Sequence, residues 1–320
     1  MSLRVAVVGV GYLGRHHASI LSALPGAELV AVVDTNRERA EEVAGVNGTR
    51  ALTDHREAIG TVDAVTIAVP TELHREIALS FLSAGIPVLV EKPMARSLDE
   101  ADAMIAAARR AGAVLAIGHT ERFNPAVATA RPILTDPRFI EVHRLGTFPE
   151  RSLDIDVVFD LMIHDLDVVL SLVRSEVESI DAVGVPVLTG RVDIANARLR
   201  FVNGCIANLT ASRISRDRVR KIRFFQPMAY LSIDYALQKV ERWLVKNDGP
   251  MPAIEGGDIE VVSEEPLKLE LADFVDAVTR RRAPLVTGED GRRALALAQQ
   301  IADKMTIEMQ PRRHEDTKTS

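Results

Sequence analysis

The segment Gly9-Val10-Gly11-Tyr12-Leu13-Gly14 decides the fold of this 320-residue chain. It follows a short β-branched run and precedes a helical stretch, the context that a Gly-x-Gly-x-x-Gly motif needs. The first glycine permits a tight turn, the second lets the backbone approach a pyrophosphate, and the third lets the helix pack on the strand. The N-terminus of that helix attracts phosphate groups. The segment therefore predicts a dinucleotide site formed by Gly9, Gly11, Tyr12, Leu13 and Gly14.

Asp34 ends the next predicted strand, 20 residues after Gly14. A carboxylate at this place accepts hydrogen bonds from the adenosine ribose hydroxyls and repels a 2′-phosphate. The sequence therefore predicts NAD as the cofactor, with NADP disfavoured, and places Thr35 in the same site. Arg37 and Arg39 follow closely and would soften this preference. The alternative is a glycine turn that binds no cofactor. The motif, its position between a strand and a helix, and the spacing to Asp34 together argue against this alternative.

The first third of the chain alternates between buried strands and helices. Repeated β-α-β units predict a doubly wound parallel sheet of the Rossmann type. The expected strands are 4–8, 28–33, 64–68, 88–91 and 114–118, and the expected helices are 12–24, 71–84 and 96–111.

After Phe123 the pattern changes to antiparallel strands. Asn203-Gly204 between two alternating runs predicts a hairpin, and Asn124-Pro125 predicts a helix start. We therefore expect an α/β protein with an NAD-binding Rossmann domain followed by an α+β domain on a mainly antiparallel sheet. The expected elements are strands 194–202, 205–212, 219–226, 230–235 and 240–246 with helices 267–280 and 291–305, in domains 1–122 and 123–310 with a disordered tail at 311–320.

One face of the second sheet is expected to bury itself against another copy of the chain, in a homodimer or homotetramer. A solvated, polar face is the alternative, because antiparallel sheets commonly have one. The expected roles of the second domain are thus substrate binding and oligomerisation.

Composition limits the class of protein. A formal charge of −6 argues against nucleic acid as a partner. The apolar run Val5–Val10 is too short to span a membrane. The single cysteine, Cys205, excludes an internal disulfide and a Cys-rich zinc site, and favours the cytoplasm. No metal site is expected, because the histidines are scattered; packing or exposure is the simpler explanation for His16 and His17 in the first helix.

Two clusters are candidates for chemistry. Glu91-Lys92-Pro93 lies at the carboxyl end of a predicted strand, where ligands bind in open α/β sheets. Lys92 there can stabilise negative charge on a substrate oxygen. Asp160 and His164 are four residues apart, which places them on one face of a helix, and a histidine accepts protons near neutral pH. The alternatives are a surface lysine and a histidine packed in the core.

The motifs in this order resemble the glucose-fructose oxidoreductase / inositol dehydrogenase (Gfo/Idh/MocA) family. They are Gly9–Gly14, Pro70-Thr71-Glu72-Leu73-His74, Glu91-Lys92-Pro93 and Asp160…His164, spread over nearly the whole chain. The resemblance implies that Lys92, Asp160 and His164 form the catalytic group. It also adds Pro70, Thr71, His74, Glu91 and Lys92 to the cofactor site.

A narrower resemblance lies in Gly118–Pro125 and Asp160–Asp167, which are similar to bacterial UDP-N-acetylglucosamine 3-dehydrogenases. It implies oxidation of the 3-hydroxyl of a sugar nucleotide, with His164 as base. Dehydrogenation of inositol or a free sugar, and a non-catalytic NAD-sensing regulator, remain alternatives. The expected substrate residues are Arg122, Asn124 and Arg144, with Arg213 and Lys221 as further candidates for meeting a diphosphate.

Overall fold

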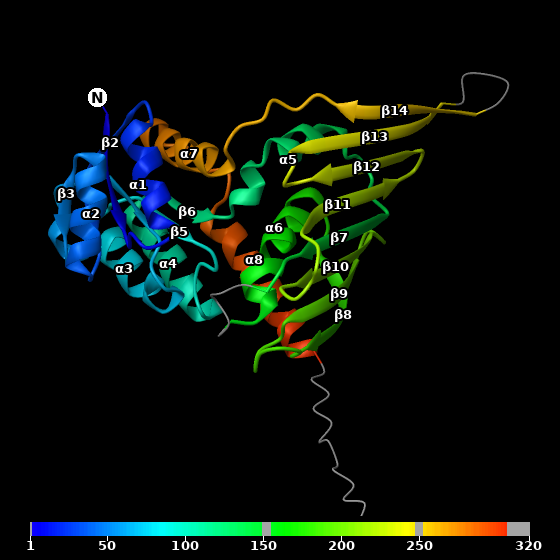
Figure 1. Cartoon of the computed structure of the whole chain (residues 1–320), viewed down its shortest axis with the longest axis horizontal. Helices are drawn as coiled ribbons and strands as arrows, with labels where there is room; N and C mark the ends of the chain where they lie inside the picture. The colour runs from blue at the N-terminus through cyan, green and yellow to red at the C-terminus, as the bar shows by residue number, and fades with distance from the viewer. Residues whose placement is uncertain (1, 149–154, 247–251, 306–320) are drawn as a thin grey trace, which may run out of the picture.

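The computed structural model describes residues 2–148, 155–246 and 252–305, and the expected tail at 311–320 lies outside them. Two sheets organise the chain (Figure 1). None of the described helices combines the length and apolar character that a membrane span requires.

The first sheet is entirely parallel and has the order β3-β2-β1-β4-β5-β6, which confirms the predicted doubly wound Rossmann fold. Its middle strands are buried along nearly their whole length, as expected for a sheet covered by helices on both faces. The elements are β1 Leu3–Val8, α1 Gly14–Ala23, β2 Ala27–Val33, α2 Arg37–Asn47, β3 Arg50–Leu52, η1 His55–Ala58, β4 Ala64–Ile67, α3 Thr71–Ser83, β5 Val88–Glu91, α4 Leu98–Ala111 and β6 Leu115–Gly118.

The sequence analysis did not predict α2 and β3. Helix α2 has a polar sequence with a weak apolar stripe, and its signals are at its ends. The Asn36 side chain accepts a hydrogen bond from Arg39 N at the start, and Gly48 ends the helix with φ +63°. Strand β3 has only three residues, too few for a period-2 pattern.

The second sheet has eight strands in the order β14-β13-β12-β11-β7-β10-β9-β8. Only the β7–β10 pair is parallel among its described ladders, so the expected mainly antiparallel sheet is confirmed. The strands are β7 Phe139–Leu145, β8 Val177–Val185, β9 Ile194–Phe201, β10 Ile206–Ser212, β11 Val219–Gln226, β12 Ala229–Asp234, β13 Lys239–Lys246 and β14 Ala253–Ile259.

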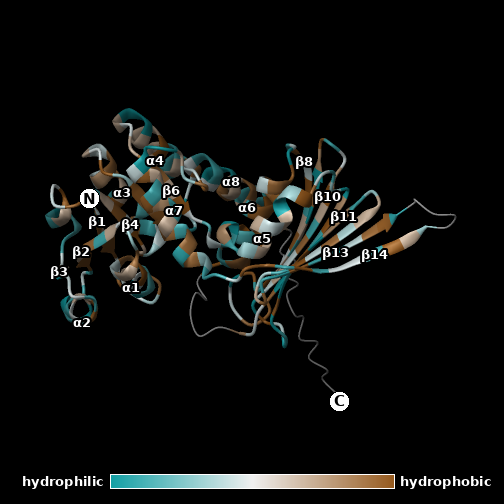
Figure 2. Ribbon diagram, turned by 90° about the horizontal axis from the view of Figure 1, so that it is seen from above, coloured by the Kyte–Doolittle hydropathy of each residue, from teal (hydrophilic) through white to brown (hydrophobic). Residues whose placement is uncertain are grey.

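Helices cover one face of this sheet and lie between it and the Rossmann unit (Figures 1 and 2). Alternation sets the faces: in β9, Leu199 and Phe201 are buried under the helices while Arg198 and Arg200 face outward. The covering elements are η2 Thr120–Phe123, α5 Pro125–Ala130, η3 Arg131–Ile133, η4 Val158–Met162, α6 Ile163–Leu172 and α8 Gly288–Lys304.

The chain returns to the Rossmann sheet after it has built the second one. Helix α7, Pro266–Arg280, packs Leu271 and Phe274 into the core beside β1 and α1. Helix α8 starts against β6, where a Cβ on Gly291 would lie 2.7 Å from Ile117 Cγ1. The boundary at residue 122 stays a prediction, and the packing of α7 shows that part of the C-terminal chain completes the first unit.

Candidate active site

A cleft of about 710 Å³ lies where the carboxyl ends of β4 and β5 face the second sheet. The Rossmann side contributes Tyr12, Thr71 and Lys92, and the opposite side contributes η4 and the ends of β7 and β11. This is the edge at which open α/β sheets bind their ligands.

The glycine loop has the shape that a pyrophosphate requires. Gly9 has φ +84°, and a Cβ there would lie 2.6 Å from Val69 Cγ1. A Cβ on Gly14 would collide with the Gly9 carbonyl oxygen, whereas one on Gly11 would meet nothing within 4 Å. Gly9 and Gly14 are therefore required for packing, while Gly11 leaves space above the loop. Helix α1 has no side-chain cap and no acid in its first turn, so its N-terminal amides suit an anion.

Asp34 is buried at the end of β2 and is held by backbone amides. Its Oδ2 accepts from Val10 N at 3.1 Å, and its Oδ1 accepts from Asn36 N at 2.9 Å. Arg39 Nη1 lies 3.3 Å from Oδ2, while Arg37 pairs with Glu41 instead. Of the two arginines, only Arg39 thus pairs with Asp34. Thr35 follows, exposed.

The two ends of the Pro70–His74 motif have different places in the site. Thr71 begins α3 directly after Pro70 and lines the cleft. His74 is buried beneath it, with Nε2 2.9 Å from Val69 O and Nδ1 3.1 Å from Pro93 O. Burial lowers the pKa of His74. Its geometry ties the loop after β5 to the loop after β4, so it supports the cofactor site from below.

Lys92 and Asp160 meet across the cleft. Lys92 Nζ donates to Asp160 O at 2.7 Å and lies 3.4 Å from Asp160 Oδ1. Both side chains keep partial exposure, 17% and 23%. The first unit thereby places a cation, and the second a carboxylate, in one solvent-accessible site.

His164 lies one turn further on, close enough for the Lys92 charge to act on it. Burial, followed by the charges of Lys92 and Arg144, holds the pKa of His164 well below its ordinary value. The ring is therefore neutral at neutral pH. Nδ1 is enclosed without a hydrogen-bond partner among the described residues, and the His119 ring stands edge-on at 6.4 Å.

The helix that carries these two residues is not regular. Residues Val158–Met162 form a π-helical turn that continues into α6. We expected Asp160 and His164 to share one face of an α-helix; Asp160 lies within the π-helical turn, and its Oδ1 is 3.4 Å from Lys92 Nζ. π-turns occur frequently at functional sites.

Three residues expected to bind substrate are held in buried interactions. Arg122 pairs with Asp167 at 3.2 Å, and the Asn124 side chain caps α5 and donates to Tyr235 O. The cleft lining does not include either of them. Arg144 does line the cleft, yet it is 5% exposed and pairs with both Asp165 and Glu121.

Different arginines are available in the cleft. The predicted Arg213 lines the cleft, but its side chain donates to the carbonyls of Ile155 and Val192. The predicted Lys221 pairs with Asp234 on the other face of β11. Sequence reasoning missed Arg218 and Arg220. Within the described part of the chain, the Arg218 side chain donates hydrogen bonds only to the Thr147 hydroxyl, and Arg220 has no side-chain hydrogen bond or ion pair. Their signal was alternation: Arg220 shares the inner face with the buried Ile222.

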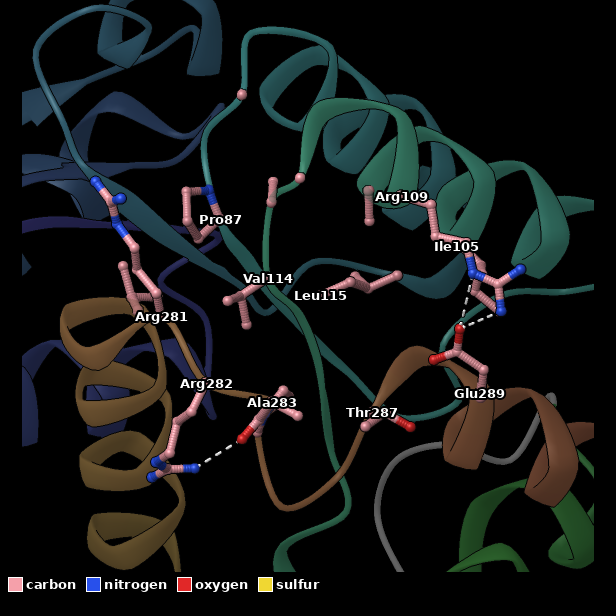
Figure 3. A pocket seen from close by; sticks show the side chains of 16 residues that line it. Pro87, Ile105, Arg109, Val114, Leu115, Arg281, Arg282, Ala283, Thr287 and Glu289 are labelled. Atoms are coloured by element: carbon pink, nitrogen blue, oxygen red, sulfur yellow. Dashed lines mark hydrogen bonds and ion pairs between the residues drawn. The ribbon is translucent and has the colours of Figure 1, made fainter.

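A second hollow lies at the opposite edge of the Rossmann sheet (Figure 3). Pro87 and Val114 mark the amino ends of its strands there, and Arg282 and Ala283 close it from the α7–α8 connection. Ligands of open α/β sheets bind at the carboxyl ends, and Lys92 and Asp160 line the first cleft but not this hollow, so we assign the site to the first cleft.

Several known proteins are similar to this chain in sequence or in fold. The UDP-N-acetylglucosamine 3-dehydrogenase of Acidithiobacillus ferrooxidans is 40% identical over 303 residues, 93% of this chain and 96% of that protein. The solved structure of that enzyme has a TM-score of 0.90 at 38% identity, covering 95% of this chain and 98% of the other. An inositol 2-dehydrogenase of an Arthrobacter strain is 34% identical over 190 residues, 56% of each protein. A levoglucosan dehydrogenase solved with NADH, 20% identical with a TM-score of 0.85, covering 95% of this chain and 97% of the other, shares the fold.

The family profiles cover the first sheet and part of the second. The profile described as oxidoreductase family, NAD-binding Rossmann fold, matches residues 3–119, and the profile of the family's C-terminal domain matches residues 134–225. The chain therefore belongs to the Gfo/Idh/MocA family of NAD-binding oxidoreductases.

Proposed function

We propose that this protein is an NAD-dependent dehydrogenase that oxidises the 3-hydroxyl of UDP-N-acetylglucosamine. The observation that carries the proposal is the contact between Lys92 and Asp160 at a cleft beside the glycine loop, with the neutral His164 one turn behind Asp160 and close enough for the Lys92 charge to act on it. The substrate is inferred from the relative that matches nearly the full length of the chain.

The cofactor would lie along the carboxyl edge of the Rossmann sheet. Gly9–Gly14 would hold the pyrophosphate, and Asp34 with Thr35 would hold the adenosine ribose. Thr71 and the Glu91-Lys92 strand end would border the nicotinamide half, with Pro70 and His74 supporting them. When bound, the nicotinamide ring accepts the hydride that leaves the sugar carbon.

His164 would take the hydroxyl proton. Because its Nδ1 is enclosed, Nε2 would be the nitrogen that meets the substrate. Lys92 would donate a hydrogen bond to the same oxygen as negative charge develops on it. Asp160 would hold the Lys92 ammonium in place, or accept a hydrogen bond from a neighbouring sugar hydroxyl. The products balance as a ketone, a reduced cofactor and one proton on His164.

Arg218 and Arg220 are our candidates for the diphosphate. They line the cleft, carry no carboxylate partner among the described residues, and stand on the second sheet away from the glycine loop. Arginine donors match phosphate oxygens in geometry and charge. They replace Arg122 and Lys221 in this role, because those two side chains pair with carboxylates away from the cleft.

An inositol or free-sugar dehydrogenase is the second candidate, favoured by the inositol 2-dehydrogenases among the relatives. The deciding experiment follows NADH absorbance while the protein and NAD are offered UDP-N-acetylglucosamine, free N-acetylglucosamine and inositols. We expect turnover with the sugar nucleotide and little with the others. Efficient oxidation of inositol would move the assignment to the second candidate. An inactive protein that binds NAD would instead support a regulator.

We propose that the protein works as a homodimer or homotetramer in the cytoplasm. The outer face of the second sheet carries Phe225 and Trp243, 38% and 42% exposed, and Phe225 stacks beside Phe139 and Tyr230. Exposed aromatic side chains on an uncovered face favour association. Light scattering that reports a monomer at micromolar concentration would reject the oligomer.

A further inference from the structure

A second group of ionisable residues lies buried close to Lys92. His17, Glu91 and Glu270 are 0%, 5% and 1% exposed, and one donor atom from each lies within 4.8 Å of the others. They come from α1, β5 and α7. His17 is three residues after Gly14, and Glu91 directly precedes Lys92, so the group joins the glycine-loop helix to the strand end that carries the lysine.

His17 and Glu91 form the ordered half of this group. His17 Nε2 lies 3.1 Å from Glu91 Oε1, and Nδ1 lies 3.2 Å from the Thr66 hydroxyl. The Glu91 carboxylate is also fitted against Gly118, where a Cβ would approach its Cδ to 2.8 Å. The carboxylate is thereby fixed on two sides, and the backbone of Lys92 continues directly from it.

Glu270 is the unexplained member. Both of its carboxylate oxygens are enclosed, and neither meets hydrogen-bond geometry with any described residue. If Glu91 and Glu270 were both ionised, the group would carry net negative charge even with His17 protonated. Burial of a carboxylate charge without a partner is unfavourable enough that the group is protonated instead.

The surroundings of Glu270 point the same way. Burial, followed by the charge of Glu91, holds the pKa of Glu270 well above its ordinary value. Two further carboxylates raise it, Asp273 on α7 itself and Asp167 on α6, while only the Thr120 hydroxyl of η2 opposes them. The His17 ring of α1 lies within reach of Glu270, but its Nε2 already contacts Glu91 Oε1 at 3.1 Å.

We propose that His17, Glu91 and Glu270 form a positioning cluster for Lys92, in which Glu270 stays a neutral acid so that the Glu91 carboxylate keeps its contact with His17. Ionisation of Glu270 would put a second negative charge beside Glu91, compete for His17 and loosen the strand end that carries Lys92. The positioning role rests on the proposed function, whereas the protonation of Glu270 does not.

Glu270→Gln tests the protonation, because glutamine copies a neutral acid at every pH. The infrared difference spectrum of wild type minus Glu270→Gln at neutral pH should contain the carbonyl band of a protonated carboxylic acid. In folded wild type Glu270 would hold a proton that it releases in the unfolded chain. The ratio of the wild-type unfolding constant to that of the variant should therefore rise about tenfold per pH unit between about pH 5.5 and 7. The difference in melting temperature, variant minus wild type, should therefore increase as pH rises.

Glu265→Gln is the matched control, since Glu265 is exposed just before α7. It should show neither the band nor the pH-dependent gain in stability. Absence of the band in the Glu270 pair, or a stability difference that does not change with pH, would overturn the neutral acid. So would a stoichiometric divalent metal in the purified protein that Glu270→Gln removes.

The positioning role has its own readout. In wild type, kcat should decline at alkaline pH as Glu270 ionises, and Glu270→Gln should move that decline to higher pH. An unchanged alkaline limb would overturn the positioning role even if the infrared band is present. If no substrate is turned over at all, the proposed function fails while the infrared and stability measurements still decide the state of Glu270.

Discussion

Lys92 Nζ lies 2.7 Å from the main-chain oxygen of Asp160, a residue of a π-helical turn in the other half of the molecule. The contact fixes the ammonium at the meeting point of the two sheets. Lys92 directly follows the Rossmann strand β5 and Asp160 lies in η4, so the contact depends on how the two halves pack against each other.

Removal of this ammonium should cost turnover rather than stability. Lys92→Met should lower kcat by about 10²–10³-fold, the usual value of one donor aimed at developing negative charge. Asp160→Asn should lower kcat less. The loss of transition-state stabilisation in the double variant should be smaller than the sum of the losses in the two single variants, because the residues act as one unit. Steady-state kinetics of the three variants checks this; strict additivity would show that the two act independently.

Cofactor choice should depend on Asp34. We expect tighter binding of NAD than of NADP. Asp34→Asn should weaken NAD binding roughly 10–100-fold, since a hydrogen bond to a charged group is worth about 1.5–3 kcal/mol. It should also narrow the NAD/NADP ratio, because Arg39 would be released to meet a 2′-phosphate. Cofactor titration monitored by fluorescence measures both constants.

Arg37→Gln is the control for this experiment, since Arg37 is exposed and pairs with Glu41 rather than Asp34. Its NAD/NADP ratio should match that of wild type. Tighter binding of NADP by the wild-type protein would contradict the role assigned to Asp34.

The fold was largely predictable from the sequence because its signals are local. The glycine motif, the β-α-β alternation and the Asn203-Gly204 turn each act within a few residues. Strands β7, β8 and β14 were not predicted. β7 is paired with β10 and β11, partners far along the chain, which a period within one strand does not specify.

The residues of the site were less predictable, because burial and pairing decide which cations are available. The sequence does not show which arginines are paired in the fold, as for Arg122, Arg144 and Arg220. Tertiary contacts give the first two carboxylate partners and leave the third without one among the described residues.

The two cleft arginines should govern affinity for the sugar nucleotide. Arg218→Gln and Arg220→Gln should each raise its KM by about tenfold, the loss of roughly one charge-assisted hydrogen bond. Arg223→Gln is the control, because Arg223 lies on the opposite face of β11 and pairs with Glu141 at 2.7 Å. Equal effects of all three variants would remove the diphosphate assignment.

The acid side of the pH profile should follow His164. Because its pKa is held below the ordinary 6.5, the base stays neutral on acidification through pH 6.5, and kcat/KM should fall only at lower pH. A fall centred above pH 6.5 in the kcat/KM profile would contradict a depressed pKa.

Acid stability should depend on the neighbouring His119. Burial, with the charges of Lys92 and Arg122, lowers its pKa to about 3. Between pH 6.5 and that value the unfolded chain binds a proton that the folded chain does not. The contribution of His119 to the free energy of unfolding should therefore fall by about 1.4 kcal/mol per pH unit on acidification through this window. His119→Leu should reduce the pH slope in denaturant titrations by about this amount, and an unchanged slope would show that His119 does not contribute to it.

The most direct test of the account is the turnover of His164→Ala, measured together with its melting temperature and its NAD dissociation constant. If His164 accepts the proton, kcat falls by about 10²–10⁴-fold, while NAD affinity hardly changes, since the glycine loop and Asp34 bind the cofactor elsewhere. A histidine that only fills the core would give the reverse pattern. A variant with a lowered melting temperature and near-normal turnover would contradict the central claim.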